Sequence, residues 1–311
     1  MGTGLDSQFM LAIEDTPGVF KAPTHSLEFN QESLHETIDK LWSNGLTPGR
    51  RMRRRFLNGG GGVAGQTLHE LTIENASILF RCALGDMDVT GASAPYTHTG
   101  TMGALPSVSA QVGVPGATVL PKSVYGLKVA TWTLNNAVDE IPTLQLDWMG
   151  VGQTKAPALG TWTPPTELHG LSFVHAVLSI DGTELEIDSL SLTGNNALSA
   201  TRKIRSVDPG RPTIREGADF RSVSGQAVCD FTNWDNYDRF VAGEGAAFEM
   251  VYADPIDGYT ITITGKVEFD NAGADVSGPE IVKETLPFTF YHEDTDAEAL
   301  TVAIETPLAA P

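Results

Sequence analysis

A stretch of 23 residues occurs twice in the chain, 160 positions apart, and this repeat constrains the possible fold more than any other feature. Residues 63–85 read VAGQTLHELTIENASILFRCALG, and residues 223–245 read VSGQAVCDFTNWDNYDRFVAGEG. The identical pairs are Val63 and Val223, Gly65 and Gly225, Gln66 and Gln226, Thr72 and Thr232, Phe80 and Phe240, and Gly85 and Gly245. A single repeat with so long a period predicts two similar domains in tandem rather than a solenoid.

Each copy is predicted to be a strand that runs into a helix. Residues 66–72 and 226–232 alternate in polarity and contain several β-favouring side chains. Thr72 and Thr232 stand at the expected N-cap positions, and the sequence from Thr232 to Asp235 is typical of a capping box.

Helical spacing predicts that each helix buries one face. The expected buried residues are Ile73, Ala76, Phe80, Ala83 and Leu84 in the first helix, and Trp234, Tyr237, Phe240 and Val241 in the second. Gly85 and Gly243 are the expected C-terminal stops. Both helices are therefore interpreted as structural elements.

The similarity extends to both sides of this repeat. Leu27-Glu28-Phe29 recurs as Leu185-Glu186-Ile187, Pro48-Gly49-Arg50 as Pro209-Gly210-Arg211, and Gly126-Leu127-Lys128-Val129 as Gly265-Lys266-Val267. The predicted organisation is an N-terminal arm (residues 1–26), a first β domain (27–155), a linker (156–168), a second β domain (169–305) and a C-terminal tail (306–311).

The charge balance excludes some classes of partner. The formal net charge is −19, so nonspecific attraction to nucleic acid or to anionic membranes is not expected. The charge is uneven, because residues 1–160 carry 11 Lys and Arg against 14 Asp and Glu, whereas residues 161–311 carry 9 against 25. No apolar run approaches the ~18 residues of a membrane span. Cys82 and Cys229 occupy non-equivalent positions of the repeat, which favours buried thiols in a protein made in the cytoplasm.

Residues 38–62 are predicted to form a long loop with a basic centre and a glycine run at its end. The basic residues are Arg50, Arg51, Arg53, Arg54 and Arg55. The acidity of the chain argues against nucleic-acid binding here. Two interpretations stay open: a docking loop whose arginines pair with carboxylates of a neighbouring subunit, or a solvated loop.

Several segments have the alternation of two-faced strands. Between residues 260 and 270, Ile261, Ile263, Val267 and Phe269 share one face, and polar residues including Glu268 share the other. Eleven residues at ~3.3 Å each span about 36 Å. Further strands are predicted at 108–114, 127–132, 143–148, 281–290 and 299–305. Such strands are typical of an antiparallel sheet with one face toward water.

The sequence contains no arrangement of residues that indicates catalysis. The seven histidines are scattered without metal-ligand spacing. No nucleophile elbow, phosphate loop or dinucleotide fingerprint is present. We therefore predict no catalytic residue, no metal site and no cofactor.

Short motifs in a particular order resemble those of a known family. They are residues 1–8, Leu27-Glu28-Phe29, residues 32–34 and 49–51, Tyr96-Thr97-His98-Thr99, Leu144-Gln145-Leu146-Asp147, residues 195–198, 241–243 and 278–280, and Leu286-Pro287-Phe288-Thr289. In this order, over nearly the whole chain, they resemble the tail tube (major tail) proteins of long-tailed, siphovirus-like bacteriophages. The run from Arg53 to Arg55 is heavier than the family pattern.

The resemblance implies a mainly β fold with two tandem β-sandwich or partial-barrel domains, each with one flanking helix. It implies a structural protein of the virion tail, made in the host cytoplasm, whose rings stack into a tube for ejection of genome DNA. DNA would pass through without specific binding, and the implied partners are other copies and the tape-measure, tail-terminator and baseplate proteins. Two alternatives are a carbohydrate-binding, hydrolytic or adhesion β module and a capsid decoration protein, although an aromatic content of 8% is low for glycan binding.

Three expectations about assembly follow from the resemblance and the repeat. The N-terminal arm and the loop 45–62 are expected to contact adjacent rings or subunits. The bore is expected to be acidic and lined by polar strand faces, with Glu268 as a candidate. If both copies of the domain line the bore, three chains give a trimer with pseudo-sixfold symmetry; the alternative is a true hexamer.

Overall fold

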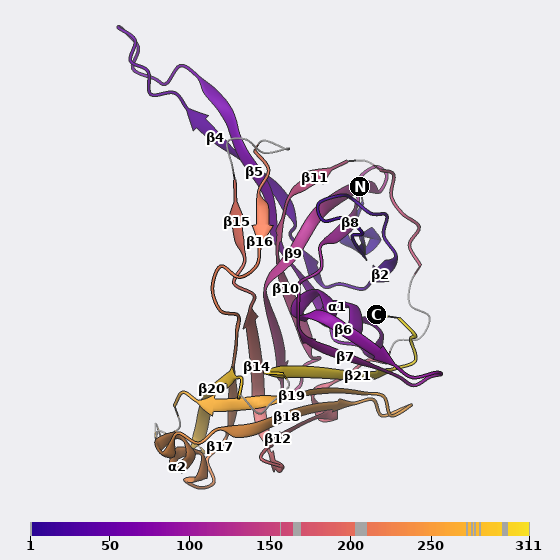
Figure 1. Ribbon diagram of the computed structural model, residues 1–311, viewed down its shortest axis with the longest axis vertical. Helices are drawn as coiled ribbons and strands as arrows, with labels where there is room; N and C mark the ends of the chain where they lie inside the picture. The colour runs from indigo at the N-terminus through magenta and orange to yellow at the C-terminus, as the bar shows by residue number, and fades with distance from the viewer. Residues whose placement is uncertain are drawn as a thin grey trace.

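Antiparallel strands dominate the structure, a computed structural model, as Figure 1 shows. It describes residues 2–155, 157–163, 169–202, 210–271, 273–274, 276, 278–279, 281–293 and 298–310. Nineteen of the described strands join in one hydrogen-bonded network, and two form a separate small sheet. The prediction of a mainly β protein is therefore confirmed. Within the described residues, no helix is long and apolar enough to cross a membrane.

A row of antiparallel strands runs through the centre of the network. Its members, in spatial order, are β3 (Gln31–Glu32) with β4 (His35–Trp42), then β5 (Phe56–Glu70), β10 (Thr143–Gly150), β9 (Leu120–Ala137), β14 (Ile187–Asn195), β17 (Ser222–Asp230), β20 (Lys283–Tyr291) and β19 (Thr260–Phe269). The pairing of β9 with β14, which we call the seam, joins the first half of the chain to the second.

Two further layers extend from β9 and β19 of this row. The N-terminal part of β9 pairs with β8 (Val108–Val114), and β8 continues to β1 (Gln8–Ile13) and β2 (His25–Leu27). In the same way β19 pairs with β18 (Ala246–Ala253), and β18 continues to β12 (Ala176–Ile180) and β13 (Thr183–Leu185). A short 3-10 helix precedes each outer layer, η1 (Gly4–Asp6) and η2 (Phe173–His175).

The remaining strands close the other edges. β11 (Gly152–Thr154) pairs with β9, and β21 (Leu300–Thr306) pairs with β19. β21 also pairs with β7 (Tyr96–Met102), and β7 pairs in turn with β6 (Gly85–Thr90). The strands predicted at 108–114, 281–290 and 299–305 are confirmed within two residues of their ends.

The first helix, α1 (Ile73–Leu84), forms as predicted. Thr72 caps it by accepting a hydrogen bond from the Asn75 backbone, and Gly85 ends it with a positive φ of 118°. The five residues expected to be buried are fully buried, in contact with β6, β7, β9 and β21. α1 thus lies between strands from both halves of the chain.

The second helix, α2 (Asp235–Ala242), differs from the prediction at its start and in its burial. Thr232 does not cap it; the residue before it is Trp234, and the Asn233 side chain accepts a hydrogen bond from the Asp235 backbone. Its expected core residues are exposed, from 37% for Phe240 to 64% for Val241. The predicted stop at Gly243 is confirmed by its left-handed conformation.

The core is continuous across the seam. Trp132 on β9 is buried and makes an edge-to-face contact with Phe80 of α1, with ring centroids 6.4 Å apart. The two cysteines are buried and free, as expected. The predicted N-terminal arm contains a core strand, since Phe9, Met10 and Leu11 of β1 are almost fully buried.

The predicted loop at 38–62 is largely a hairpin of β4 and β5. The glycine run lies inside β5, where a Cβ on Gly61 would come within 2.8 Å of the Thr37 carbonyl oxygen. Only residues 43–55 connect the strands. The predicted linker and C-terminal tail fall partly outside the described residues, as does Pro209 of the repeated motif.

Candidate functional site: the assembly surfaces

The β4–β5 hairpin, which we call the arm, projects from the body of the molecule (Figure 1). All five predicted arginines, Arg50, Arg51, Arg53, Arg54 and Arg55, are exposed at its tip. None of them forms an ion pair with a side chain that the structure describes. The structure therefore brings them together without supplying an acidic partner.

The arm is apolar as well as basic. Trp42 and Phe56 face each other across the strands, with ring centroids 5.3 Å apart, and each is about half exposed. Leu41, Leu46, Met52 and Leu57 are also exposed. A projecting surface that combines apolar and charged side chains is typical of a protein contact.

The root of the arm is anchored by the second half of the chain. Beside it lies the small sheet of β15 (Ser199–Thr201) and β16 (Thr213–Arg215) (Figure 1). Arg202 pairs with Asp39 at 3.0 Å, and Arg211 pairs with Glu36. The root is thus fixed to the body, and the tip is left for other molecules.

The central strands present one face of small polar side chains. In register across the row lie Gln145, Thr133, Thr193, Ser224, Thr289 and Glu268. Thr133 and Thr193 form a hydrogen bond of 3.3 Å across the seam. The predicted lumen candidate, Glu268, is exposed on this polar side of β19.

The strands of this row carry no arginine and few lysines. Each lysine of β9, β19 and β20 contacts a carboxylate: Lys122 pairs with Glu32, Lys128 with Glu216, Lys266 with Glu293 and Lys283 with Asp188. These cations are neutralised, so they offer little attraction to phosphate.

The leading edge of the row is open. β3 and β4 pair with β5 on one side, and no described strand pairs with their other side. An open edge exposes backbone donors and acceptors that can pair with another chain.

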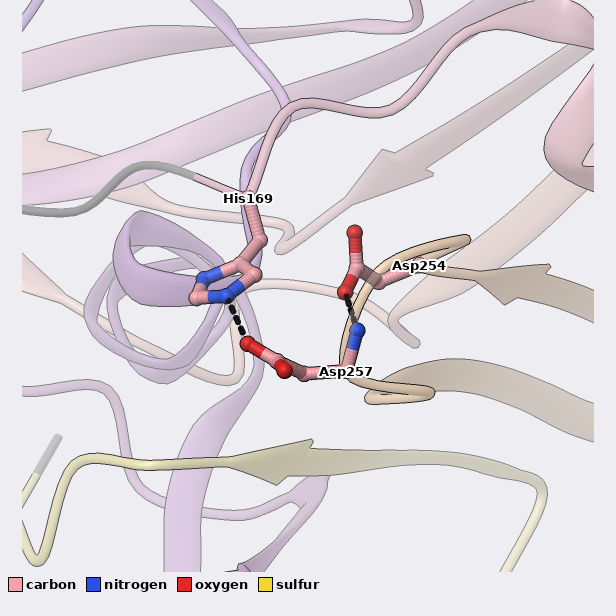
Figure 2. A group of neighbouring side chains, drawn as sticks. All are labelled: His169, Asp254 and Asp257. Atoms are coloured by element: carbon pink, nitrogen blue, oxygen red, sulfur yellow. Dashed lines mark hydrogen bonds and ion pairs between the residues drawn. The ribbon is translucent and has the colours of Figure 1, made fainter.

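An ionic cluster, buried except for Asp257, joins the two halves beside α1 (Figure 2). The ring of His169 contacts Glu74 of α1 through Nδ1 and the Asp257 carboxylate, 2.8 Å away, through Nε2. Asp254 is almost fully buried and accepts a hydrogen bond from the Asp257 backbone at 2.7 Å. Tyr259 packs edge-to-face on the imidazole, with ring centroids 5.2 Å apart.

This cluster is the one group of side chains in the described chain with the donor set of a metal site. The potential ligand atoms of His169, Asp254 and Asp257 all lie within 4.8 Å of one another. The hydrogen bond with Glu74 is the main cause that raises the pKa of His169 to about 9, against the opposing effect of burial. An imidazolium has no free lone pair, so at neutral pH the cluster is an ionic clamp. The sequence did not reveal it because its members lie far apart in the chain.

Replacement of His169 by glutamine tests the clamp. A folded pKa of about 9 lies above the unfolded value of 6.5, so the stabilisation is complete below pH 6.5 and is lost as the pH rises through 9. We expect His169→Gln to lower the free energy of unfolding by about 3 kcal/mol at pH 6 and by much less at pH 10. Urea unfolding of both proteins at the two pH values measures the difference. An equal difference at both would contradict the clamp.

The described residues thus define a class: a β-rich structural protein with a projecting arm, an open sheet edge and a neutralised polar face, all suited to self-association. The family model described as phage tail tube protein matches residues 4–290. The chain therefore belongs to the phage tail tube protein family; it is a non-enzymatic component of the virion tail. No curated protein matches the sequence.

Proposed function

We propose that three chains form each ring of the tail tube, because each chain supplies two equivalent units. The support is the correspondence of elements. The order η1, β1, β2, β3–β4, β5, α1, β8, β9, β10, β11 in the first half parallels η2, β12, β13, β14, β17, α2, β18, β19, β20, β21 in the second. The parallel leaves out the hairpin β6–β7 in the first half and the small sheet of β15 and β16, which lies between β14 and β17 in the second half.

The pairing pattern of the two units is also parallel. In the first unit β4, β5, β10 and β9 are neighbours, and in the second β14, β17, β20 and β19 follow the same order. We assign η1 and β1 to the first unit rather than to the separate N-terminal segment (residues 1–26) that the sequence predicted. The units then extend to about residue 155 and from 169 to 306, with the linker between them.

The seam is the template for the contact between chains. Within one chain, β9, which ends the strand row of the first unit, pairs with β14, which begins the strand row of the second unit. The same contact between chains would join β19, which ends the row of the second unit, to the open edge of β3 and β4 in the next copy. Such a head-to-tail contact closes when the rotation per unit completes a circle, and six units from three chains give pseudo-sixfold symmetry. The rival is a hexamer with only one unit of each chain at the bore.

The polar face of the central row is the proposed bore surface. This face carries hydroxyl and amide side chains and Glu268, and the lysines of β9, β19 and β20 are paired with carboxylates. Such a surface would let DNA slide without binding. The arm is proposed to contact the adjacent ring. By its resemblance, the tube is that of a long-tailed, siphovirus-like phage, with tape-measure, tail-terminator and baseplate proteins as partners.

Electron microscopy of tubes from the purified chain tests this proposal. We expect cross-sections with three identical subunits and six similar units around the bore, and the polar face toward the channel. Six identical subunits, with the second unit held away from the bore, would reject the trimer. A channel lined by unpaired arginine and lysine would reject the assignment of the face.

A further inference from the structure

We propose that α2 docks into a hollow on the first unit of the neighbouring copy. The hollow is lined by Gly2, residues 5–8 and 115–119, and Trp162. This inference rests on the proposed ring and adds the residues that hold one chain to the next. It follows from three observations: an exposed apolar helix face, an internal template for its cover, and an open hollow at the corresponding place.

The helix face is an aromatic surface that no described residue covers. Trp234, Tyr237 and Val241 are 56%, 40% and 64% exposed, and their spacing places them on one side of the helix. Trp234 stacks edge-to-face on Phe231 and on Tyr237, with ring centroids 5.0 and 5.5 Å apart. The aromatic side chains are therefore already held in place, so docking would cost little ordering entropy.

The cover of α1 is the template. Trp234 occupies the repeat position of Glu74, the residue of α1 that contacts His169. The start of α1 is bound by the segment before η2: the Ile73 backbone donates to the His169 carbonyl at 3.2 Å, and Thr72 forms a β-bridge with Gly170. The turn between β18 and β19 completes this cover through Asp257.

The first unit contains the counterparts of both covering segments. Gln8 pairs with Gly113 as Ala176 pairs with Tyr252. This register aligns Gly2 with Gly170, η1 with η2, and the turn at 115–119 with the turn between β18 and β19. In the second unit these segments cover a helix. In the first unit they border the hollow, where Leu5 is 96% exposed.

Geometry and connectivity assign the occupant to a second copy. α2 and the N-terminal end of the chain lie on opposite sides of the molecule, so a chain cannot fill its own hollow (Figure 1). In the first unit the hairpin β6–β7 follows the helix. In the second unit β18 begins at Ala246, shortly after α2 ends, so α2 has no hairpin of this kind beside it. Docking is head to tail: α2 of one copy contacts the first unit of the next copy, as α1 contacts the second unit within one chain. The proposed ring requires this arrangement.

The first test replaces Trp234 by aspartate in the full chain. Trp234 is more than half exposed in the single chain and makes only two edge-to-face contacts there, so we expect the unassembled variant to stay folded, with a melting temperature lower by no more than a few degrees. We expect its critical concentration for tube formation to rise about thirtyfold or more, as for a buried aromatic anchor. The matched control, Val89→Asp, places the same charge on β6, and it should assemble like the wild type. Assembly of Trp234→Asp at the wild-type concentration would overturn the proposal.

The second test detects the contact directly and does not depend on that variant. Asp238→Cys, one turn along α2 from Trp234, is combined with Ala117→Cys, and assembled protein is treated with a short bis-maleimide; Trp234 is retained, and Cys82 and Cys229 are buried. We expect a ladder of linked chains that ends at three, and none from the pair Asp238→Cys with Val89→Cys. A ladder ending at six would keep the docking contact and reject the trimer. Tubes without links would reject the docking and keep the tube, whereas a wild-type chain that forms no tubes would reject the proposed ring itself.

Discussion

Replacement of Arg53, Arg54 and Arg55 by glutamate is expected to abolish tube formation and to leave the single chain folded. The three side chains lie at the tip of the arm and have no carboxylate partner among the described residues. The chain carries a net charge of −19, so an adjacent ring offers abundant acidic acceptors. Reversal turns attraction into repulsion at each site, and loss of one partner of a desolvated charge pair at an interface costs about 2–5 kcal/mol.

The measurement is pelleting of tubes, with electron microscopy and thermal unfolding of the soluble fraction. A matched control reverses Lys21, Lys155 and Arg215, which changes the net charge equally at sites away from the tip of the arm. We expect this control to assemble, and we expect both unassembled proteins to unfold within about 0.5 kcal/mol of the wild type. Normal tubes from the arginine variant would show that the tip is only a solvated loop.

Local signals in the sequence predicted the elements of the core well. The alternation of Ile261, Ile263, Val267 and Phe269 identified the buried face of β19, because one-sided burial produces a period of two. The caps at Thr72 and Gly85 bounded α1, because a helix end needs partners for its free backbone groups. The strands that flank these elements followed from the same rules.

The same rules failed where burial depends on distant segments. The helical period of Trp234, Tyr237 and Val241 is as clear as that of α1, yet nothing in the part of the chain that the structure describes covers this face. A period shows that a helix has an apolar side, but it does not show which molecule lies against that side. We ascribe this pattern to the proposed ring, in which the hollow of the next copy would cover these side chains.

The strand conformation of the glycine run and the cluster at His169 could not be predicted from the sequence, for a second reason. Glycine is more frequent in loops than in strands, so the run from Gly59 to Gly62 predicted a loop. In the structure these residues lie in β5, where the absence of side chains allows close packing of the strands. His169 meets Glu74 and Asp257 only after the two halves pack together. Neither feature has a local signature, since each depends on contacts between residues remote in sequence.

Replacement of Gly194 by valine is expected to disrupt the seam and to lower the free energy of unfolding by about 3 kcal/mol or more. Gly194 on β14 pairs with Trp132 on β9, and a Cβ at this position would lie 2.2 Å from the indole ring. The indole is almost fully buried against Phe80, so it has no free space to move into. Valine otherwise favours strands, so a loss of stability would come from this clash alone.

The control is Gly278→Val, where no described atom beyond the chain neighbours lies within 4 Å of the added Cβ, and urea unfolding measures all variants. A second substitution, Trp132→Leu, gives valine room at position 194. We therefore expect Gly194→Val with Trp132→Leu to be more stable than the sum of the two single losses predicts, because both act on the same contact. Additive losses, or a Gly194→Val protein as stable as the wild type, would show that the seam does not depend on this packing.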